Sequence, residues 1–191
     1  MVLASQRLTL EDYLAYADAS ETRHELVDGV LVEMPPESRL NARIAMFLIA
    51  EFLRHVPFQL LCCKDTELEV SGRLAKVRLP DLMLLTEELD QLLGTARGTI
   101  TREMPPPQLI VEVVSPGKVN EDRDYRYKRS EYAARGVAEY WIVDPTSKII
   151  TILIWVEGLY EAQTFQGDNQ LQSLTLPDLT LTAAQVFAAG Q

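Results

Sequence analysis

Two acidic residues stand next to long apolar runs, where an acidic side chain needs a chemical reason. Glu112 lies inside the run 109–114, LIVEVV, and Asp81 follows Pro80 and precedes the apolar run 82–85. Burying an unpaired charge is so unfavourable that such groups are normally ion-paired, protonated or bound to a metal ion. If the two segments form neighbouring strands of a sheet, their carboxylates can share one hard divalent cation such as Mg²⁺.

A lysine downstream of Glu112 lies on the inner stripe of the next expected helix. Tyr125, Lys128 and Tyr132 are spaced at i, i+3 and i+7, which places them on one side of a helix. If this side packs on the sheet, the ammonium of Lys128 reaches toward the carboxylates and supplies positive charge for a phosphate oxygen. The structural alternative is a lysine whose stem covers apolar surface while its charge reaches water, and the spacing alone favours that alternative.

The two acids have structural alternatives as well. Glu112 is either a metal ligand or half of a buried salt bridge, and both interpretations stay open. Pro-Asp pairs occur at strand ends and turns; Asp178 follows Pro177 without a subsequent apolar run, so we predict a turn there. Only the combination of Asp81, Glu112 and Lys128 favours a functional site.

The elements that must position these residues are helices and strands in alternation. Spacing and capping residues predict helices at 9–16, 38–56, 86–93, 120–136 and 183–189, with Thr9, Ser38, Thr86, Asn120 and Thr182 as N-caps. Asp28-Gly29 predicts a tight hairpin between short strands at 25–27 and 30–32. Further strands are expected at 60–70 (one strand or a pair), 77–85, 109–115, 137–143, 149–156, 160–165 and 171–176, the last four forming a C-terminal meander.

The composition is that of an ordinary globular protein, with 47% hydrophobic and 24% charged residues, and we expect one domain spanning residues 1–191. Cys62 and Cys63 are adjacent in a predicted strand, where side chains point to opposite faces, so we expect free thiols. The N-terminus lacks a basic segment followed by an apolar core, and no run is long enough to span a bilayer. We therefore expect a cytoplasmic protein without a membrane partner.

The net charge of −10 argues against a broad basic surface that binds nucleic acid non-specifically. Local basic groups occur in two segments, one with Arg73, Lys76 and Arg78, the other with Lys118, Arg123, Arg126, Lys128 and Arg129. The second group is interleaved with acidic residues. A nucleic-acid contact and a mixed solvated surface both remain open for these groups.

Several sequence blocks, taken in order, resemble the bacterial Uma-two family of endonucleases, a branch of the PD-(D/E)xK nuclease superfamily. The blocks are TLEDYL from residue 9, RHELVDGVLVEM, RLPDLMLL, LIVEVVSP, and YRYKRSEYAARGVAEYWIVDP ending at Pro145. Together they cover about two thirds of the chain. Several such blocks in the same order are specific, whereas any one of them is not.

The resemblance implies an α/β fold with a restriction-endonuclease-like core, in which a mixed central β-sheet is flanked by helices. It implies Mg²⁺, with Mn²⁺ as a substitute, bound by Asp81, Glu112 and the backbone carbonyl of Val113. It also nominates Glu25, in HELVDG, as a further catalytic acid near the metal. The alternative for Glu25 is a strand residue that faces solvent ahead of the turn.

Two positions depart from the expected pattern. The superfamily's Glu-x-Lys would place a lysine at 114, where this chain has Val114. Members of this branch carry a lysine in the following helix, and Lys128 matches that position, with Lys118 as the lesser candidate. Relatives often have histidine at the position of Asn41, at the start of the long helix.

The activity implied by the resemblance is endonucleolytic hydrolysis of phosphodiester bonds in nucleic acid, DNA rather than RNA, with Lys128 stabilising the transition state. A rival is a catalytically silent module that binds nucleic acid or protein, which Asn41, Val114 and the negative charge favour. A third reading is a self-associating structural protein, with the C-terminal meander at 149–176 as the subunit contact. We expect a homodimer or higher homo-oligomer.

Overall fold

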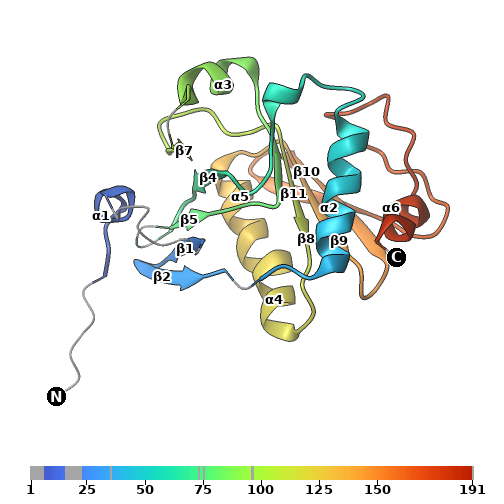
Figure 1. Cartoon of the computed structure of the whole chain (residues 1–191), viewed down its shortest axis with the longest axis horizontal. Coiled ribbons are helices and arrows are strands. Elements are labelled where there is room, and N and C mark those ends of the chain that lie inside the picture. The colour runs from blue at the N-terminus through green and yellow to red at the C-terminus, as the bar shows by residue number, and fades with distance from the viewer. Residues whose placement is uncertain are drawn as a thin grey trace.

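The computed structural model describes residues 7–15, 23–34, 36–72, 74, 76–95 and 97–190, and shows two mixed β-sheets with helices packed against them (Figure 1). The larger sheet has the order β11–β10–β9–β8–β6–β3, formed in that order by Leu159–Phe165, Ile149–Val156, Glu139–Asp144, Leu109–Val113, Leu82–Leu84 and Leu61–Cys62. The smaller sheet has the order β2–β1–β5–β4–β7, formed by Val30–Glu33, His24–Val27, Val77–Arg78, Thr66–Glu69 and Gly98–Ile100. The mixed α/β architecture expected from the sequence is thus confirmed.

The helices are α1 (Leu10–Ala15), α2 (Arg39–Phe52), α3 (Glu87–Leu93), α4 (Lys118–Asp122), α5 (Arg129–Arg135) and α6 (Ala183–Ala189), with a 3₁₀ turn at Phe58–Leu60. A π-helical turn, Arg123–Lys128, joins α4 directly to α5. This helical segment connects β8 to β9, which run parallel, whereas the other neighbours in the larger sheet are antiparallel. A parallel pair needs such a crossover, and the crossover places the helical segment against the sheet beside β8.

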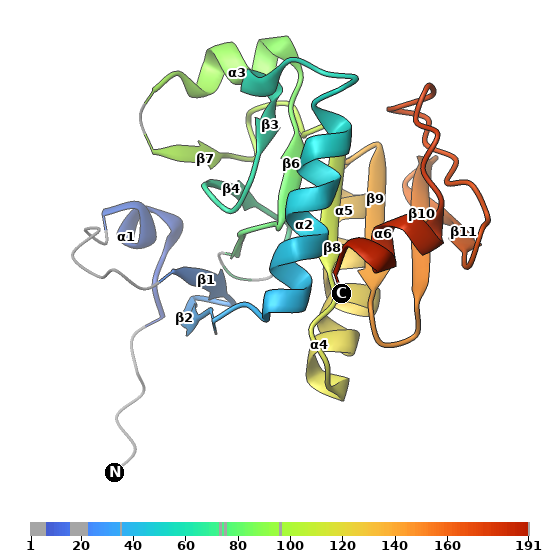
Figure 2. The ribbon, with the colours of Figure 1, turned by 45° about the vertical axis from the view of Figure 1, so that its right-hand side comes forward.

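The larger sheet lies between α2 and α6 on one face and α5 on the other (Figure 2). Alternate residues of β8 serve the two faces, because side chains along a strand point in opposite directions. Val111 and Val113 belong to the apolar core with α2 and α6, whereas Ile110 belongs to the core that contains Tyr132 of α5. Glu112 therefore points toward the crossover helix.

The chain passes from the smaller sheet to the larger one between β5 and β6. β5 pairs with β1 and β4, while β6 pairs with β3 and β8. Leu79, Pro80 and Asp81 separate the two strands, since proline has no N–H to donate to a ladder. The single strand predicted at 77–85 is therefore wrong, and the break places Asp81 at the junction of the two sheets.

Most of the predicted elements are confirmed. α1, α2, α3 and α6 follow the expected caps, and the hydroxyls of Ser38, Thr86 and Thr182 accept the N–H groups of Asn41, Leu89 and Gln185. The turn of the β1–β2 hairpin is formed by Asp28 and Gly29, and both residues have positive φ. β9, β10 and β11 form an antiparallel meander. Residues 60–70 contain two strands, β3 in the larger sheet and β4 in the smaller one. Pro177-Asp178 forms a turn, and both cysteines are free.

Other expectations are wrong. The segment 171–176 is a loop, because the N–H groups of Leu174 and Thr175 donate to the Glu139 carboxylate at 3.0 and 2.8 Å instead of joining a ladder. The crossover helix begins at Lys118, and Asn120 donates its side-chain amide to the Pro116 carbonyl rather than capping.

Further differences concern the ends of elements and short strands. α2 ends at Phe52 rather than 56, ahead of Pro57, which disfavours helical geometry in the preceding residue. The short strand β7 was not predicted. Tyr16, the predicted end of the first helix, and Arg73 of the first basic group lie outside the described residues. No helix within the described ranges is long and apolar enough to cross a membrane.

Candidate active site

The centre of the candidate site is a buried ion pair between β8 and the crossover helix. Lys128 Nζ lies 2.7 Å from Glu112 Oε1, and the Tyr132 hydroxyl donates to the same oxygen, also at 2.7 Å. Lys128 is 1% and Glu112 3% exposed. Both contacts are made to Oε1, and Glu112 also lines the pocket described below.

The π-helical turn carries Lys128 and a second acid toward the sheet. Asp124 lies one helical turn before Lys128, and its Oδ1 is 3.6 Å from the ammonium. The Tyr140 hydroxyl of β9 donates to the main-chain carbonyl of Asp124 at 3.0 Å, which fixes this turn on the sheet. π-Helical turns are rare, and they occur frequently at functional sites.

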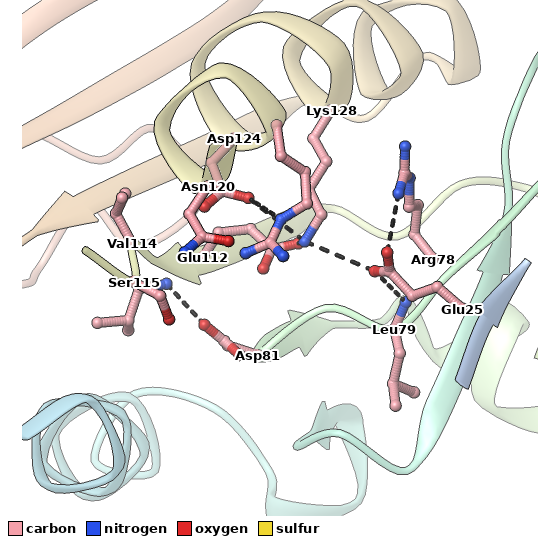
Figure 3. A network of polar contacts seen from close by, with 12 residues as sticks. Glu25, Arg78, Leu79, Asp81, Glu112, Val114, Ser115, Asn120, Asp124 and Lys128 are labelled. Carbon is pink, nitrogen blue, oxygen red and sulfur yellow. Dashed lines mark hydrogen bonds and ion pairs between the residues drawn. The ribbon is translucent and has the colours of Figure 1, made fainter. Parts of the chain in front are cut away.

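Three carboxylates surround the Lys128 ammonium. They belong to Glu112, Asp124 and Glu25 of β1, and Glu25 Oε1 lies 3.7 Å from Nζ (Figure 3). Burial lowers the pKa of Lys128, but the three acids outweigh this effect and raise it above its ordinary value. The lysine is therefore charged. Burial raises the pKa of Glu112 above the ordinary range, with Asp81 and Asp124 adding to the rise and Lys128 opposing it.

Asp81 approaches Glu112 from the neighbouring strand. The β6–β8 ladder ends at the pair Leu82–Val111, and beyond it Asp81 Oδ2 accepts the N–H of Val113 at 2.7 Å. The carboxylate thus replaces a strand as the partner of that main-chain N–H. The other oxygen, Oδ1, lies 3.0 Å from Nζ of Lys64. β6, which begins directly after Asp81, and β8, which carries Glu112, are neighbours in the larger sheet, so the condition set by the sequence analysis is met.

A pocket of about 50 Å³ opens between these groups. Its lining includes Asp81, Glu112, Val113 and Lys128, together with Glu37, Lys64 and Arg123. This volume suits one small cation with bound water, since about 10–15 Å³ of such cavity volume is enough to hold a water molecule. Four of the residues singled out in the sequence therefore come together in one pocket.

The Val113 carbonyl, the expected third metal ligand, is contacted by Asn41 of α2. The buried Asn41 amide lies 3.3 Å from the carbonyl oxygens of both Val113 and Val114. These are long hydrogen bonds, and a carbonyl oxygen has a second lone pair, so the Val113 carbonyl can still bind another group. The Val114 side chain lies in the apolar core.

Glu25 belongs to the surroundings of the site rather than to the pocket lining. It is 2% exposed, so the alternative of a solvent-facing residue is wrong. Its carboxylate lies 2.8 Å from Arg78 and accepts the N–H of Leu79 at 3.3 Å (Figure 3). Burial raises the pKa of Glu25, but Lys128 and Arg78 outweigh it and hold the pKa below its ordinary value.

The basic residues proposed as nucleic-acid contacts differ in their surroundings. Arg78 is 3% exposed and binds Glu25 and Glu131, and Lys76 also binds Glu131 at 3.1 Å. These two cations hold the core together and form no free basic surface. Lys118, the lesser lysine candidate, is exposed and pairs with Asp122 at 3.1 Å, away from the pocket lining.

The family model described as "Putative restriction endonuclease", Uma2, matches residues 10–184. The chain belongs to the Uma2 family. A solved structure, "a putative nuclease belonging to DUF820" from Anabaena variabilis, shares its fold with a TM-score of 0.71 at 13% sequence identity. The alignment covers 96% of this chain and 99% of that one. No curated protein is similar enough in sequence to count as a relative.

The donor atoms of this Uma2 pocket suit a hard cation. Two carboxylates and a main-chain carbonyl are oxygen ligands of the kind that Mg²⁺ and Mn²⁺ prefer. No three His, Cys, Asp or Glu side chains among the described residues could hold a metal ion by themselves. The remaining positions around an ion would thus fall to water or a phosphate oxygen, as is usual for Mg²⁺.

Sequence reasoning missed three charged residues of the Uma2 site, Asp124, Lys64 and Glu37. Asp124 lies four residues before Lys128, a spacing that pairs an acid with a lysine on one helix face, so this signal was available. Lys64 follows the short strand β3 in a bend, and no periodicity or motif marks it. Only the fold brings Lys64 to Asp81.

Proposed function

We propose that this Uma2 protein is a Mg²⁺-dependent endonuclease that hydrolyses phosphodiester bonds in nucleic acid, with DNA as the substrate. The observation that carries the proposal is the convergence of Asp81, Glu112 and the Val113 carbonyl with the charged Lys128 in one pocket. The family match and the nuclease-like fold support the broader class, a nuclease. Because a fold alone does not establish an activity, the proposal depends on the chemistry of the pocket.

In this proposal Asp81, Glu112 and the Val113 carbonyl hold the divalent cation. When bound, the cation would polarise the phosphate and lower the pKa of a water molecule, with Mn²⁺ as a substitute for Mg²⁺. Glu112 would bind the cation through Oε2, because Lys128 and Tyr132 both contact Oε1. The two hydrogen bonds thereby orient the carboxylate before any ligand arrives.

Lys128 would stabilise negative charge that develops on the phosphoryl oxygens as water adds to phosphorus. The bond from phosphorus to one ester oxygen breaks, and the proton released by the water balances the proton taken up by the leaving oxygen. Glu25 and Asp124 keep the lysine charged and in place. We propose Glu25 as a positioning residue, since it reaches the site through Lys128.

A cleavage assay with matched variants tests this function. The wild-type protein should nick a supercoiled plasmid in Mg²⁺ or Mn²⁺ and lose the activity in chelator. Asp81→Ala and Glu112→Gln should each reduce cleavage by about a hundredfold or more, as expected for a ligand or charge-stabilising group. Asp178→Ala is the matched control, because Asp178 also follows a proline but lies exposed in a turn. Equal activity in all four proteins would contradict the proposed site.

A catalytically silent binding module is the second candidate. Val114 supplies no lysine next to Glu112, and Asn41 stands where relatives often have histidine. The net charge of −10 is also unfavourable for contact with a polyanion. This alternative predicts DNA or RNA retention that survives Asp81→Ala and Glu112→Gln, with no cleavage in any metal ion. Substrates of both kinds in one assay also decide between DNA and RNA.

We further propose a homodimer formed through the C-terminal meander. β11 is an edge strand of the larger sheet, and Leu159 beside the β10–β11 turn is 74% exposed. An exposed edge is a ready template for pairing with a second copy. Light scattering should give twice the monomer mass, and Leu159→Lys should reduce it to the monomer. A monomeric wild type would contradict this contact.

A further inference from the structure

Lys64 is a second cation in the pocket, and it is attached to a proposed metal ligand. Its Nζ lies 3.0 Å from Asp81 Oδ1 and 2.6 Å from Glu37 Oε2, and its side chain is 19% exposed. Lys64 has a φ of +54°, which is uncommon for a residue other than glycine. The bend is held by Asp65, whose carboxylate accepts the N–H of Cys63 at 3.0 Å.

Both oxygens of Asp81 are engaged in this arrangement. Oδ2 accepts the Val113 N–H at 2.7 Å, and Oδ1 contacts the Lys64 ammonium. Each Asp81 oxygen keeps a free lone pair, but a divalent cation bound at Oδ1 would lie close to the Lys64 ammonium. The two positive charges repel each other in this half-buried pocket, so the ammonium opposes metal binding as long as it stays at Oδ1.

The pocket lining itself holds as many cationic as anionic side chains, while Asp124 just outside the lining contacts Arg123 and Lys128. The three carboxylates Glu37, Asp81 and Glu112 face the three cations Lys64, Arg123 and Lys128. Lys64 lies between the carboxylates of Glu37 and Asp81, which favour its charged form. Glu37 is also the closer partner of Lys64, and it can retain the ammonium after Asp81 is released.

We propose that Lys64 is a tethered cation that occupies Asp81 in the metal-free protein and must leave it, remaining on Glu37, when a divalent cation binds. This inference rests on the proposed metal site of the nuclease and adds a competitor built into the chain. Lys64 thereby weakens metal binding relative to the same ligands without it. The exchange neither makes nor breaks a covalent bond.

Metal binding to neutral variants of Lys64 tests the inference. We would titrate Mg²⁺, and separately Mn²⁺, into the wild-type protein, Lys64→Met and Asp81→Ala by calorimetry. Lys64→Met removes the competing charge and should bind Mg²⁺ at least roughly tenfold more tightly than the wild type. The matched control is Lys148→Met, because Lys148 has a nearly equal φ of +55°, is exposed, and does not line the pocket.

A second variant, Lys64→Asn, keeps the test valid if Lys64→Met does not fold. Lys64→Asn also removes the ammonium, and asparagine accepts the left-handed backbone conformation more readily than most residues. Both variants should show a larger rise in melting temperature with Mg²⁺ than the wild type does. Binding seen in the Lys64 variants but too weak to measure in the wild type supports the tethered cation.

Two other outcomes overturn different parts of the argument. If the wild type binds Mg²⁺ through Asp81, and the Lys64 variants bind it equally or more weakly, Lys64 is no competitor and the nuclease site still stands. If neither the wild type nor any Lys64 variant binds Mg²⁺ or Mn²⁺, the metal site itself fails, and the tethered cation fails with it.

Discussion

Lys128 Nζ and Glu112 Oε1 lie 2.7 Å apart, and both side chains are almost completely buried. The pair joins the crossover helix to the central strand β8 at the point where Asp81 reaches the same strand. A buried ion pair is weak evidence for stability, because desolvation of the two charges offsets much of their attraction. At the pocket, the pair also fixes the orientation of the Glu112 carboxylate.

Removing this lysine should destabilise the protein strongly. Lys128→Met keeps most of the aliphatic stem but leaves Glu112, Glu25 and Asp124 close together without their shared cation. We expect the free energy of unfolding to fall by about 3–5 kcal/mol. Urea denaturation measures the change, with Lys148→Met as the exposed control.

The loss should be partly recovered when the buried charge is also removed. The double variant Lys128→Met/Glu112→Gln should lose less unfolding free energy than the two single variants lose together. Each single variant leaves the charge of the other residue without its partner, whereas the double variant removes both charges. Additive effects in this double-mutant cycle would show that the two side chains are energetically independent, contrary to the geometry.

The Tyr132 hydroxyl offers a milder test of the same carboxylate. Tyr132→Phe keeps the buried ring and removes one hydrogen bond to Glu112 Oε1. A hydrogen bond to a charged group contributes about 1.5–3 kcal/mol, compared with about 1 kcal/mol for a neutral one. The matched control is Tyr160→Phe, whose hydroxyl donates to the neutral Val137 carbonyl at 2.8 Å. Because burial raises the pKa of Glu112 to about 7, urea denaturation is run above that pH, where it should show the larger loss for Tyr132→Phe. Equal losses there would contradict a charged Glu112.

Much of the fold and part of the site could be predicted from local sequence. An acid inside an apolar run identified Glu112, and spacing on one helix face placed Lys128 toward the sheet. Both rest on side-chain periodicity, which is a local property of strands and helices. The caps Ser38, Thr86 and Thr182 were local as well, and their elements form where expected.

What could not be predicted depends on contacts between distant segments. Lys64 meets Asp81 only because β3 and β6 share a sheet. The loop 171–176 has the hydrophobicity of a strand, yet its N–H groups bind Glu139, more than thirty residues earlier in the chain. A pattern of single residues does not reveal which partner a main-chain donor will find.

Acid should reduce the contribution of Glu25 to stability. The pKa of Glu25 is lower in the folded protein than its ordinary value of 4.5, because Lys128 and Arg78 outweigh the effect of burial. The stabilisation is therefore complete above that ordinary value and is lost as the pH falls through the lowered folded pKa. The difference in unfolding free energy between the wild type and Glu25→Gln should be constant near neutral pH. It should narrow below about pH 4 in urea titrations. A difference that stays the same in acid would contradict the assignment of these charges.

Divalent cations should stabilise the folded protein through Asp81. A ligand that binds only the folded state adds about 2.7 kcal/mol at a concentration of one hundred times its Kd. We therefore expect the melting temperature of the wild type to rise with Mg²⁺ and to return to its starting value in chelator. Asp81→Ala should abolish the rise, whereas the exposed Asp178→Ala should keep it. A rise that survives Asp81→Ala would show that the ion binds elsewhere, and Asp81 would then be only the partner of the Val113 N–H and Lys64.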